Sequence, residues 1–555
     1  MTNTDLHSWG HPDFSQSPWA TTARDHGPEA AWRAALTHNP ADGLAQVGGT
    51  WAVAWTPGDG RVLMAVDRFA ARSLCWRLHD GGLRFAPRAD ALADRDTPVA
   101  AQALYDYLFF HAIPAPRTVF TGVQRLPAGH WLQFQQGRVD VQPYWVPRFD
   151  EHHRAPLTEL KAEFMRLVQQ GVARQLDGSL AACYLSGGTD SSTVAGMIRR
   201  VTGQGARAYS IGFEAQGYDE MAYARIAAKA FGADHHAYYV TPDDLVRSIP
   251  AVAAHFDQPF GNSSALPAYL CAQRAQQDGV SHLLAGDGGD ELFGGNARYA
   301  KQRVFGWYQQ VPGALRSGLL EPLLLNSPAG RLPGLRKAAS YIEQAKVPMP
   351  ARLNMYNLLL RLGTQDVLTP DFLAQIDSEA PSRLQDDVWR LPQTGSELNR
   401  TLAFDWRFTL ADSDLPKVVM SAELAQVSVG FPLLDTDLLA FSLRLDPALK
   451  LRGLKLRWFF KEALRGFLPE SILTKSKHGF GLPFGVWAVQ HPALKALAHA
   501  SLGSLARRGM VRPDFIEALL QHHVVAHPGY YGEMVWILMM LEQWLQQHAP
   551  DTSWH

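Results

Sequence analysis

The chain of 555 residues exceeds what one hydrophobic core organises, so we expect two or three domains. Its 52 basic and 53 acidic residues nearly balance, which favours a small molecule or a peptide as partner and gives no reason to expect nucleic acid or membrane. Three cysteines lie far apart in the sequence and predict neither a zinc site nor a disulfide framework. The start of the sequence lacks a signal-peptide pattern and no 18 uncharged apolar residues run together, so we predict a cytoplasmic protein.

The first part of the sequence, to about residue 147, is predicted to form strands joined by short turns. Residues 50–55 and 61–67 read as two strands around a Pro-Gly-Asp-Gly turn. Residues 74–78 and 83–86 read as a second hairpin, and residues 126–145 frame a third. Sequential strands on short turns predict a largely antiparallel sheet.

The pattern changes near residue 150. Residues 157–172 carry apolar residues at helical intervals, and beyond them short apolar strands alternate with helices. The predicted strands are residues 181–185, 208–213, 237–240 and 282–285. This alternation predicts βαβ units and a doubly wound parallel sheet, whose ligands bind beyond the carboxyl ends of the strands. From residue 298 onward we expect mostly helices, the last of them at residues 536–548.

The most informative stretch, Ser-Gly-Gly-Thr-Asp-Ser-Ser, follows the strand that ends at Leu185. A loop between a strand end and a helix start presents unpaired N–H groups and the positive end of the helix dipole, which favours phosphate. Asp190 can add a Mg²⁺ ligand. A flexible linker is the alternative reading, which the flanking strand and helix disfavour. The candidate ATP and pyrophosphate ligands are Leu185, Ser186, Gly187, Gly188, Asp190, Ser191 and Ser192.

A second glycine-rich stretch, Gly-Asp-Gly-Gly-Asp-Glu-Leu-Phe-Gly-Gly, follows the predicted strand at residues 282–285. Both loops are predicted at the same edge of the sheet, so one Mg²⁺ would bridge Asp190 and Asp290. Asp287 is then available for proton transfer or substrate contact, and Gly286 joins the nucleotide contacts. The alternative is an acidic turn without a ligand, which the pairing of the two loops disfavours.

The Ser-Gly-Gly-x-Asp-Ser order resembles the pyrophosphate loop of ATP pyrophosphatases, and no Gly-Lys-Ser/Thr follows as in a Walker loop. With the acidic loop and a Lys-x-Gly-Phe-like stretch at residues 473–483, the chain resembles asparagine synthetases. That resemblance implies an ATP pyrophosphatase (adenine nucleotide α-hydrolase-like) α/β sheet with a helical C-terminal part, and ATP and Mg²⁺ as cofactors. It also implies that Lys477 stabilises charge on the α-phosphate, and that Ser210 and Ile211 lie against adenine.

The first part resembles the glutamine amidotransferase domain of that family, an α+β, Ntn-hydrolase-like antiparallel fold. Such domains use a cysteine directly after the initiator methionine as nucleophile. Here Thr2 stands in that place, Cys75 reads as a core residue, and too few residues precede the strand at 50–55 for the family's first strands. We therefore predict a degenerate amidotransferase-like domain at residues 1–150, without glutaminase activity, and an asparagine synthetase-like domain at residues 151–555.

The acceptor region departs from the family pattern. Lys417 matches it, but Val419 and Met420 stand where the family has Asp and Arg. Losing two charges near the expected acceptor pocket favours a substrate other than free aspartate. Asp412, Asp414 and Lys417 are the candidate substrate contacts.

The leading hypothesis is an AMP- and pyrophosphate-forming amide synthetase in which a substrate-borne amine attacks an adenylated carboxylate. Lasso peptide macrolactam cyclases and β-lactam synthetases are relatives of this kind, and a cyclase would imply a precursor peptide and a leader-processing protease as partners. Asparagine synthesis from aspartate and ammonia is the alternative. A non-catalytic binding partner with this fold is the third hypothesis.

Overall fold

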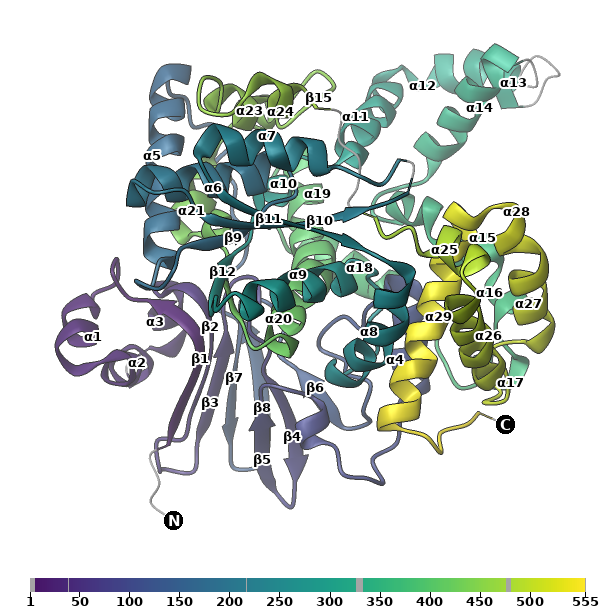
Figure 1. Cartoon of the computed structure of the whole chain (residues 1–555), viewed down its shortest axis with the longest axis horizontal. Coiled ribbons are helices and arrows are strands. Elements are labelled where there is room, and N and C mark those ends of the chain that lie inside the picture. The colour runs from purple at the N-terminus through teal and green to yellow at the C-terminus, as the bar shows by residue number, and fades with distance from the viewer. Residues whose placement is uncertain (1–4, 38, 216, 326–332, 476–480, 555) are drawn as a thin grey trace.

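The computed structural model describes residues 5–37, 39–215, 217–325, 333–475 and 481–554. Antiparallel strands come first, a parallel sheet between helices follows, and a helical region packs beside that sheet (Figure 1). The predicted order, an antiparallel part followed by a doubly wound α/β part, is therefore confirmed.

Two antiparallel sheets form the first part. Their orders are β1-β2-β3-β7-β8 and β5-β4-β6. The strands are β1 (Leu6–Asp13), β2 (Gly48–Trp55), β3 (Val62–Val66), β4 (Cys75–His79), β5 (Gly82–Ala86), β6 (Val123–Arg125), β7 (His130–Gln135) and β8 (Arg138–Pro143). Alternate residues of β2 point to opposite faces. Trp51 and Val53 join one core cluster with Trp32, whereas Ala52 and Ala54 join another with Trp76.

Two expectations for this part are wrong. Helices interrupt the predicted strands and turns: α1 (Ala20–His26), α2 (Pro28–Thr37), α3 (Pro40–Ala45) and α4 (Ala101–Phe110). In α2 the apolar residues Ala31, Trp32, Ala35 and Leu36 follow helical spacing and are buried. The residues before β2 also suffice for a first strand, because β1 pairs with β2 antiparallel along its whole length.

The second part contains a parallel sheet of order β11-β10-β9-β12-β13. Its strands are β9 (Ala182–Tyr184), β10 (Arg207–Phe213), β11 (Asp234–Val240), β12 (His282–Leu284) and β13 (Ser428–Gly430). Helices cover both faces, with α6 (Thr189–Thr202) and α7 (Met221–Phe231) on one and α9 (Ala265–Gln277) and α20 (Leu415–Leu424) on the other (Figure 1). The strand order reverses between β9 and β12, which places a ligand crevice beyond their carboxyl ends.

The remaining elements are mostly helical, as predicted. They are α5 (Leu157–Gln175), α8 (Pro242–His255), α10 (Gly289–Phe293), α11 (Ala297–Gln310), α12 (Gly313–Leu315), α13 (Glu321–Leu325), α14 (Pro333–Lys346), α15 (Leu358–Leu362), α16 (Thr364–Val367), α17 (Pro370–Leu373), α18 (Ala380–Arg390), α19 (Glu397–Asp405), the π-helix η5 (Trp406–Asp414), α21 (Thr436–Arg444), α22 (Pro447–Lys450), β14 (Leu451–Arg452), β15 (Lys455–Leu456), α23 (Trp458–Ala463), α24 (Glu470–Thr474), α25 (Phe484–Gln490), α26 (Pro492–Ala506), α27 (Pro513–Ala518), α28 (Val524–Ala526) and α29 (Pro528–His548).

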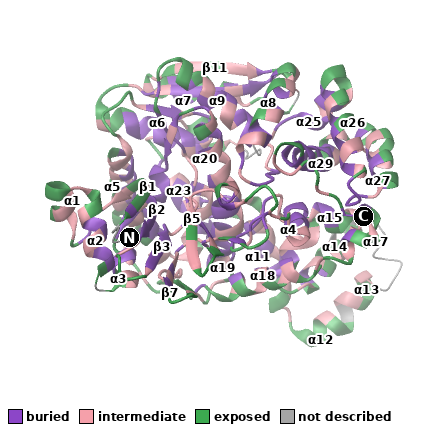
Figure 2. Ribbon diagram, turned by 90° about the horizontal axis from the view of Figure 1, so that it is seen from below, coloured by how far each residue is buried: buried purple, intermediate pink, exposed green. Residues whose placement is uncertain are grey.

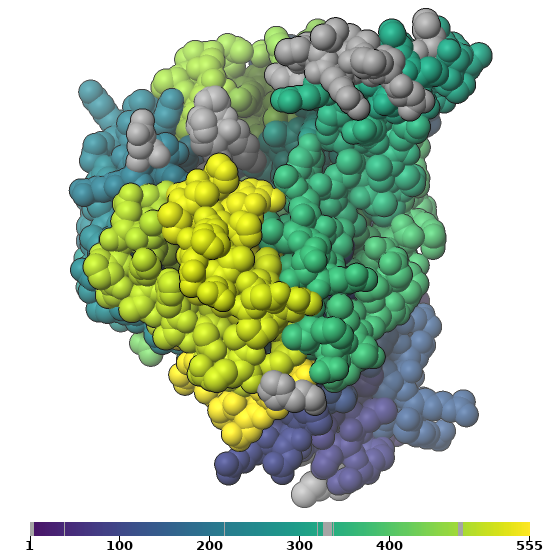
Figure 3. Space-filling view, turned by 90° about the vertical axis from the view of Figure 1, so that its right-hand side faces the viewer, coloured from purple at the N-terminus to yellow at the C-terminus, as the bar shows by residue number. Residues whose placement is uncertain are grey.

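One hydrophobic core combines residues from early, middle and late parts of the sequence. Figure 2 shows α29 as a largely buried helix, and Figure 3 shows the C-terminal helices beside the middle of the chain. One apolar cluster joins α4 to α8, α26 and α29, and Tyr107 donates a hydrogen bond to the carbonyl of Ile537 (2.8 Å). The domain bounds at residues 150 and 151 stay a prediction. None of the described helices combines the length and apolar character that a membrane crossing needs.

Candidate active site

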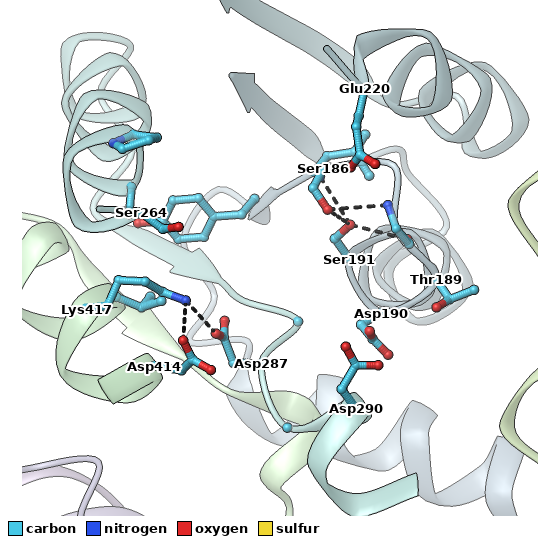
Figure 4. A pocket seen from close by; sticks show the side chains of 18 of the residues that line it. Ser186, Thr189, Asp190, Ser191, Glu220, Ser264, Asp287, Asp290, Asp414 and Lys417 are labelled. Carbon is cyan, nitrogen blue, oxygen red and sulfur yellow. Dashed lines mark hydrogen bonds and ion pairs between the residues drawn. The ribbon is translucent and has the colours of Figure 1, made fainter. Parts of the chain in front are cut away.

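A pocket of about 470 Å³ lies beyond the carboxyl ends of β9 and β12. Both predicted loops line it, together with Glu220, which precedes α7, and side chains of α9, η5, α20, α23 and α24. We call the part around Ser186, Asp190 and Asp290 the phosphate end, and the part around Asp287, Asp414 and Lys417 the substrate end (Figure 4).

The phosphate end is built by the loop between β9 and α6. Ser186 and Ser191 place their Oγ atoms 3.0 Å apart, and the N–H groups of Ser186 and Gly188 donate to these hydroxyls. At Gly187, with φ +73°, an added Cβ would lie 2.4 Å from the Ala224 nitrogen of α7. Close packing of loop and helix therefore requires glycine here. Ser192 is fully buried in α6 and does not line the pocket.

The two predicted metal ligands meet in this pocket. Figure 4 shows the carboxylates of Asp190 and Asp290 pointing toward each other. Glycines leave them room: an added Cβ at Gly289 would lie 2.1 Å from Asp190 Oδ1, and one at Gly295 would lie 1.7 Å from Asp290 Oδ1. Two loops separated by a hundred residues therefore converge as the sequence predicted.

Arg457, which the sequence analysis missed, lies between these carboxylates. Its Nη1 is 2.8 and 2.5 Å from the two oxygens of Asp190 and 2.6 Å from Asp290 Oδ1, and its Nη2 donates to Thr189 Oγ1 (2.5 Å). Burial opposes its charge, but Asp190 and Asp290 outweigh burial and raise the pKa of Arg457. Local sequence carries no signal for this contact, because Arg457 follows Asp190 by 267 positions.

The donor set fits a magnesium ion. Carboxylate oxygens are the ligands that Mg²⁺ prefers, and the guanidinium between them shows that this position stabilises a cation. No group of three or more His, Cys, Asp or Glu residues suited to a metal occurs in the described part of the chain. Phosphate oxygens and water would therefore complete the coordination, as is usual for Mg²⁺ at nucleotides.

The substrate end is a carboxylate–lysine–carboxylate arrangement. Lys417 Nζ lies 3.0 Å from Asp414 Oδ1 and 3.6 Å from Asp287 Oδ1 (Figure 4). Burial raises the pKa of Asp287, Lys417 opposes that rise, and Asp414 adds to it. Burial and then Asp290 raise the pKa of the neighbouring Glu291 well above its usual range. Three acids therefore face one lysine in this region.

The wall beside the two ends comes from β9, β10 and α9. It contains Tyr184, Tyr209, Ile211, Ser264, Pro267, Ala268 and Cys271, besides Leu185 and Gly286 at the strand ends. Ile211 therefore lines the pocket, and its contact with adenine stays a prediction. Ser210 points elsewhere, because its Oγ donates to the Leu185 carbonyl (2.5 Å) and lies 2.7 Å from His235 Nε2.

Asp412 does not reach this pocket. It lines a second cavity of about 200 Å³ between the two parts of the chain, where it pairs with Arg125 (3.1 Å) and Arg407 (2.5 Å). Val419 and Met420 line the same cavity, so the uncharged pair is not at the acceptor site as the sequence analysis assumed. Side chains of the π-helix η5 and of the following helix α20 line both cavities. The residue spacing alone did not indicate which of them faces which cavity.

Three further charged residues line the phosphate end without having been predicted there. Lys475 lies 2.9 Å from Glu220 and over the ring of Tyr223, and both members of the ion pair face the pocket. Lys461 also lines it, and burial followed by Arg457 lowers its pKa. The predicted Lys477 lies outside the described residues, so its role stays a prediction.

The three cysteines are all buried and none forms a disulfide. Burial raises the pKa of Cys75 and Cys183 to about 12, and it raises that of Cys271 as well. A nucleophilic cysteine needs an exposed thiol with a lowered pKa. Cys75 is therefore a core residue, as predicted, and Thr2 lies outside the described residues.

Comparison with known proteins supports the predicted fold class, an Ntn-hydrolase-like part followed by an ATP pyrophosphatase-like α/β part. The asparagine synthase family model matches residues 163–546, and the glutamine amidotransferase domain model matches residues 33–145. Glutamine-hydrolyzing asparagine synthetase 1 of Bacillus subtilis is 22% identical over 503 residues, covering 88% of this chain and 76% of that protein. A protein of Mycobacterium tuberculosis named as a glutamine-hydrolyzing asparagine synthetase is 24% identical over 510 residues, 88% of this chain and 75% of its own. Amidase chry2 of Gibberella zeae is 25% identical over 264 residues, 44% of this chain and 39% of its own.

Proposed function

Because the chain belongs to the asparagine synthase family, we propose that it adenylates a substrate carboxylate and joins it to an amine of the same substrate, as a lasso-type macrolactam cyclase does. The chain is an ATP-dependent ligase that forms carbon–nitrogen bonds. The observation that carries the proposal is the two-ended pocket, in which a cation-binding carboxylate pair adjoins the Asp287–Lys417–Asp414 group.

Adenylation takes place at the phosphate end. A carboxylate is a poor electrophile, and its attack on the α-phosphate of ATP gives an acyl adenylate and releases pyrophosphate. The hydroxyls of Ser186 and Ser191 and the first turn of α6 hold the phosphates. Bound through Asp190 and Asp290, Mg²⁺ would neutralise charge on the leaving pyrophosphate.

Amide formation takes place at the substrate end. The amine attacks the acyl carbon, AMP leaves with the bonding electrons, and the nitrogen must lose a proton. Asp287 lines the pocket there, and its raised pKa makes it a better proton acceptor than an exposed aspartate. Lys417 opposes the rise in the pKa of Asp287, and Asp414 and Asp287 outweigh burial and raise the pKa of Lys417 itself.

The source of the amine separates the candidates. Buried, protonated cysteines argue against glutamine hydrolysis, so the proposal uses a substrate-borne amine and requires a precursor peptide and a leader-processing protease as partners. The names of the relatives favour a second candidate, synthesis of asparagine from aspartate and ammonia. A non-catalytic binding role is less consistent with ion-binding carboxylates that face a common pocket.

Pyrophosphate release by the purified protein with Mg²⁺-ATP tests the proposal. A cyclase releases pyrophosphate only with a precursor peptide, whereas an asparagine synthetase does so with aspartate and ammonium. If neither substrate stimulates release above the rate with ATP alone, the proposal fails. Glutamine serves as the control, because we expect no glutamate above background.

A further inference from the structure

We propose that Arg457 occupies the divalent-cation position in the ligand-free protein, so that the metal binds together with the nucleotide and not before it. This rests on the proposed function, which assigns Asp190 and Asp290 to the metal. The guanidinium group contacts three carboxylate oxygens of this pair through one nitrogen, Nη1. A metal ion that bridges the same oxygens would need the same space.

Arg457 is held in place by more than charge. Its side chain is 8% exposed, its backbone N–H donates to the Gly294 carbonyl (3.1 Å), and its Nη2 donates to Thr189. These contacts tie the residue to both loops at once. Two facing carboxylates without a cation would repel each other, so Arg457 stabilises the convergence of the loops while the pocket is empty.

Binding of the nucleotide phosphates changes the competition between Arg457 and the metal for the two carboxylates. A free metal ion competes with a guanidinium that already has its hydrogen bonds, whereas a metal–nucleotide complex brings phosphate oxygens that accept hydrogen bonds from arginine. The Thr189 contact keeps the guanidinium beside the phosphate loop, so a short side-chain movement suffices. Nucleotide therefore supplies the new partner that releases the carboxylates to the metal.

Lys461 is another basic residue of the described chain that interacts with both carboxylates, and it does not take the position of Arg457. Lys461 lines the pocket and interacts electrostatically with Asp290 and Asp190, but no ion pair joins it to either carboxylate among the described contacts. Glu291 adds negative charge from the same loop. Lys461 is therefore the matched control, a basic pocket residue without the bridging geometry.

Binding of Mn²⁺ without nucleotide, followed by electron paramagnetic resonance of the unbound ion, tests this inference. In Arg457→Gln we expect affinity for Mn²⁺ at least about tenfold above that of the unmodified protein, since a charge that faces both carboxylates is gone. In Lys461→Gln we expect a change below about threefold. With a non-hydrolysable ATP analogue present, the unmodified protein should bind Mn²⁺ tightly.

A second variant controls for misfolding of Arg457→Gln. Arg457→Lys keeps the charge but loses the planar guanidinium with its several N–H donors, so its Mn²⁺ affinity should fall between those of the unmodified protein and Arg457→Gln. Adding Mn²⁺ should raise the thermal midpoint of Arg457→Gln more than that of the unmodified protein. Equal Mn²⁺ affinity in Arg457→Gln and the unmodified protein, or an equal gain in Lys461→Gln, would overturn the inference. Neither measurement needs turnover, so failure of the proposed function appears separately, as absent pyrophosphate release.

Discussion

The two ends of the pocket are built in different ways. The phosphate end centres on two short loops, each of whose residues are neighbours in the sequence, Ser186–Ser191 and Gly288–Asp290. The substrate end combines Asp287 with Asp414 and Lys417, which come from a π-helix and the helix after it. The two loops of the phosphate end can each be recognised as a local motif, whereas the substrate end combines a loop residue with residues of distant helices.

The charges of the two ends differ as well. At the phosphate end three basic residues, Arg457, Lys461 and Lys475, line the pocket, whereas at the substrate end Lys417 alone among the described basic residues lies between carboxylates. Substitutions at the phosphate end should therefore affect every partial reaction. Substitutions at the substrate end should affect amide formation more than adenylation.

The largest expected effect is that of Asp190→Asn. Losing one of the two proposed metal carboxylates should lower pyrophosphate release by about a thousandfold or more, because charge neutralisation of the leaving group is lost. Stopped assays of pyrophosphate with Mg²⁺-ATP and the active substrate measure this. The exposed Asp371, substituted in the same way, is the control and should retain full activity. Activity within tenfold of the unmodified protein would remove Asp190 from the metal site.

Asp287→Asn should have the next largest effect, and it distinguishes the substrate end of the pocket from the phosphate end. Amide product should fall by about 10²–10⁴-fold, the usual contribution of a general base. Pyrophosphate exchange, which reports adenylation, should fall much less. Because burial raises the pKa of Asp287, activity of the unmodified protein should decline as the pH falls through that raised pKa and Asp287 gains a proton. Equal losses in both partial reactions would contradict the separation of the ends.

Lys417→Met should have a smaller effect, which is a shift of the pH–rate profile in one direction. Lys417 lowers the pKa of Asp287, so removing the lysine raises that pKa further. The acid limb of the pH–rate profile should therefore move to higher pH, by an amount that a series of assays across the neutral range would measure. An acid limb that stays in place, or moves to lower pH, would show that the two groups are not coupled.

The smallest effects are expected for two tyrosines of the pocket wall. The buried hydroxyl of Tyr184 has no hydrogen-bond partner among the described residues, so Tyr184→Phe should leave the free energy of unfolding unchanged or raise it by up to about 1 kcal/mol. Tyr209 donates to Asp278 (2.9 Å), so Tyr209→Phe should lower it by about 1 kcal/mol. Urea unfolding followed by fluorescence measures both free energies of unfolding. A larger loss in Tyr184→Phe than in Tyr209→Phe would contradict the hydrogen-bond assignment.

The sequence predicted much of this molecule where a motif is local. Strand, glycine loop and helix around Ser186–Ser191 follow from short-range pattern, and so do β10, α7 and the acidic loop after β12. It missed α1 to α4, whose apolar spacing was read as strand and turn. It also missed β13, a three-residue edge strand; β9 and β12 are equally short, but each is followed by a glycine-rich loop that indicated a strand end.

By itself, therefore, the sequence determined the two glycine-rich loops with their aspartates and the alternation that makes a parallel sheet, since each depends on residues close together in the chain. Only the tertiary structure decided that Arg457 lies between those aspartates, that Lys417 joins Asp414 to Asp287, and that Asp412 turns to another cavity. Hydrogen bonds and ion pairs across hundreds of positions depend on how helices pack, and packing leaves no spacing in the sequence from which such partners can be read.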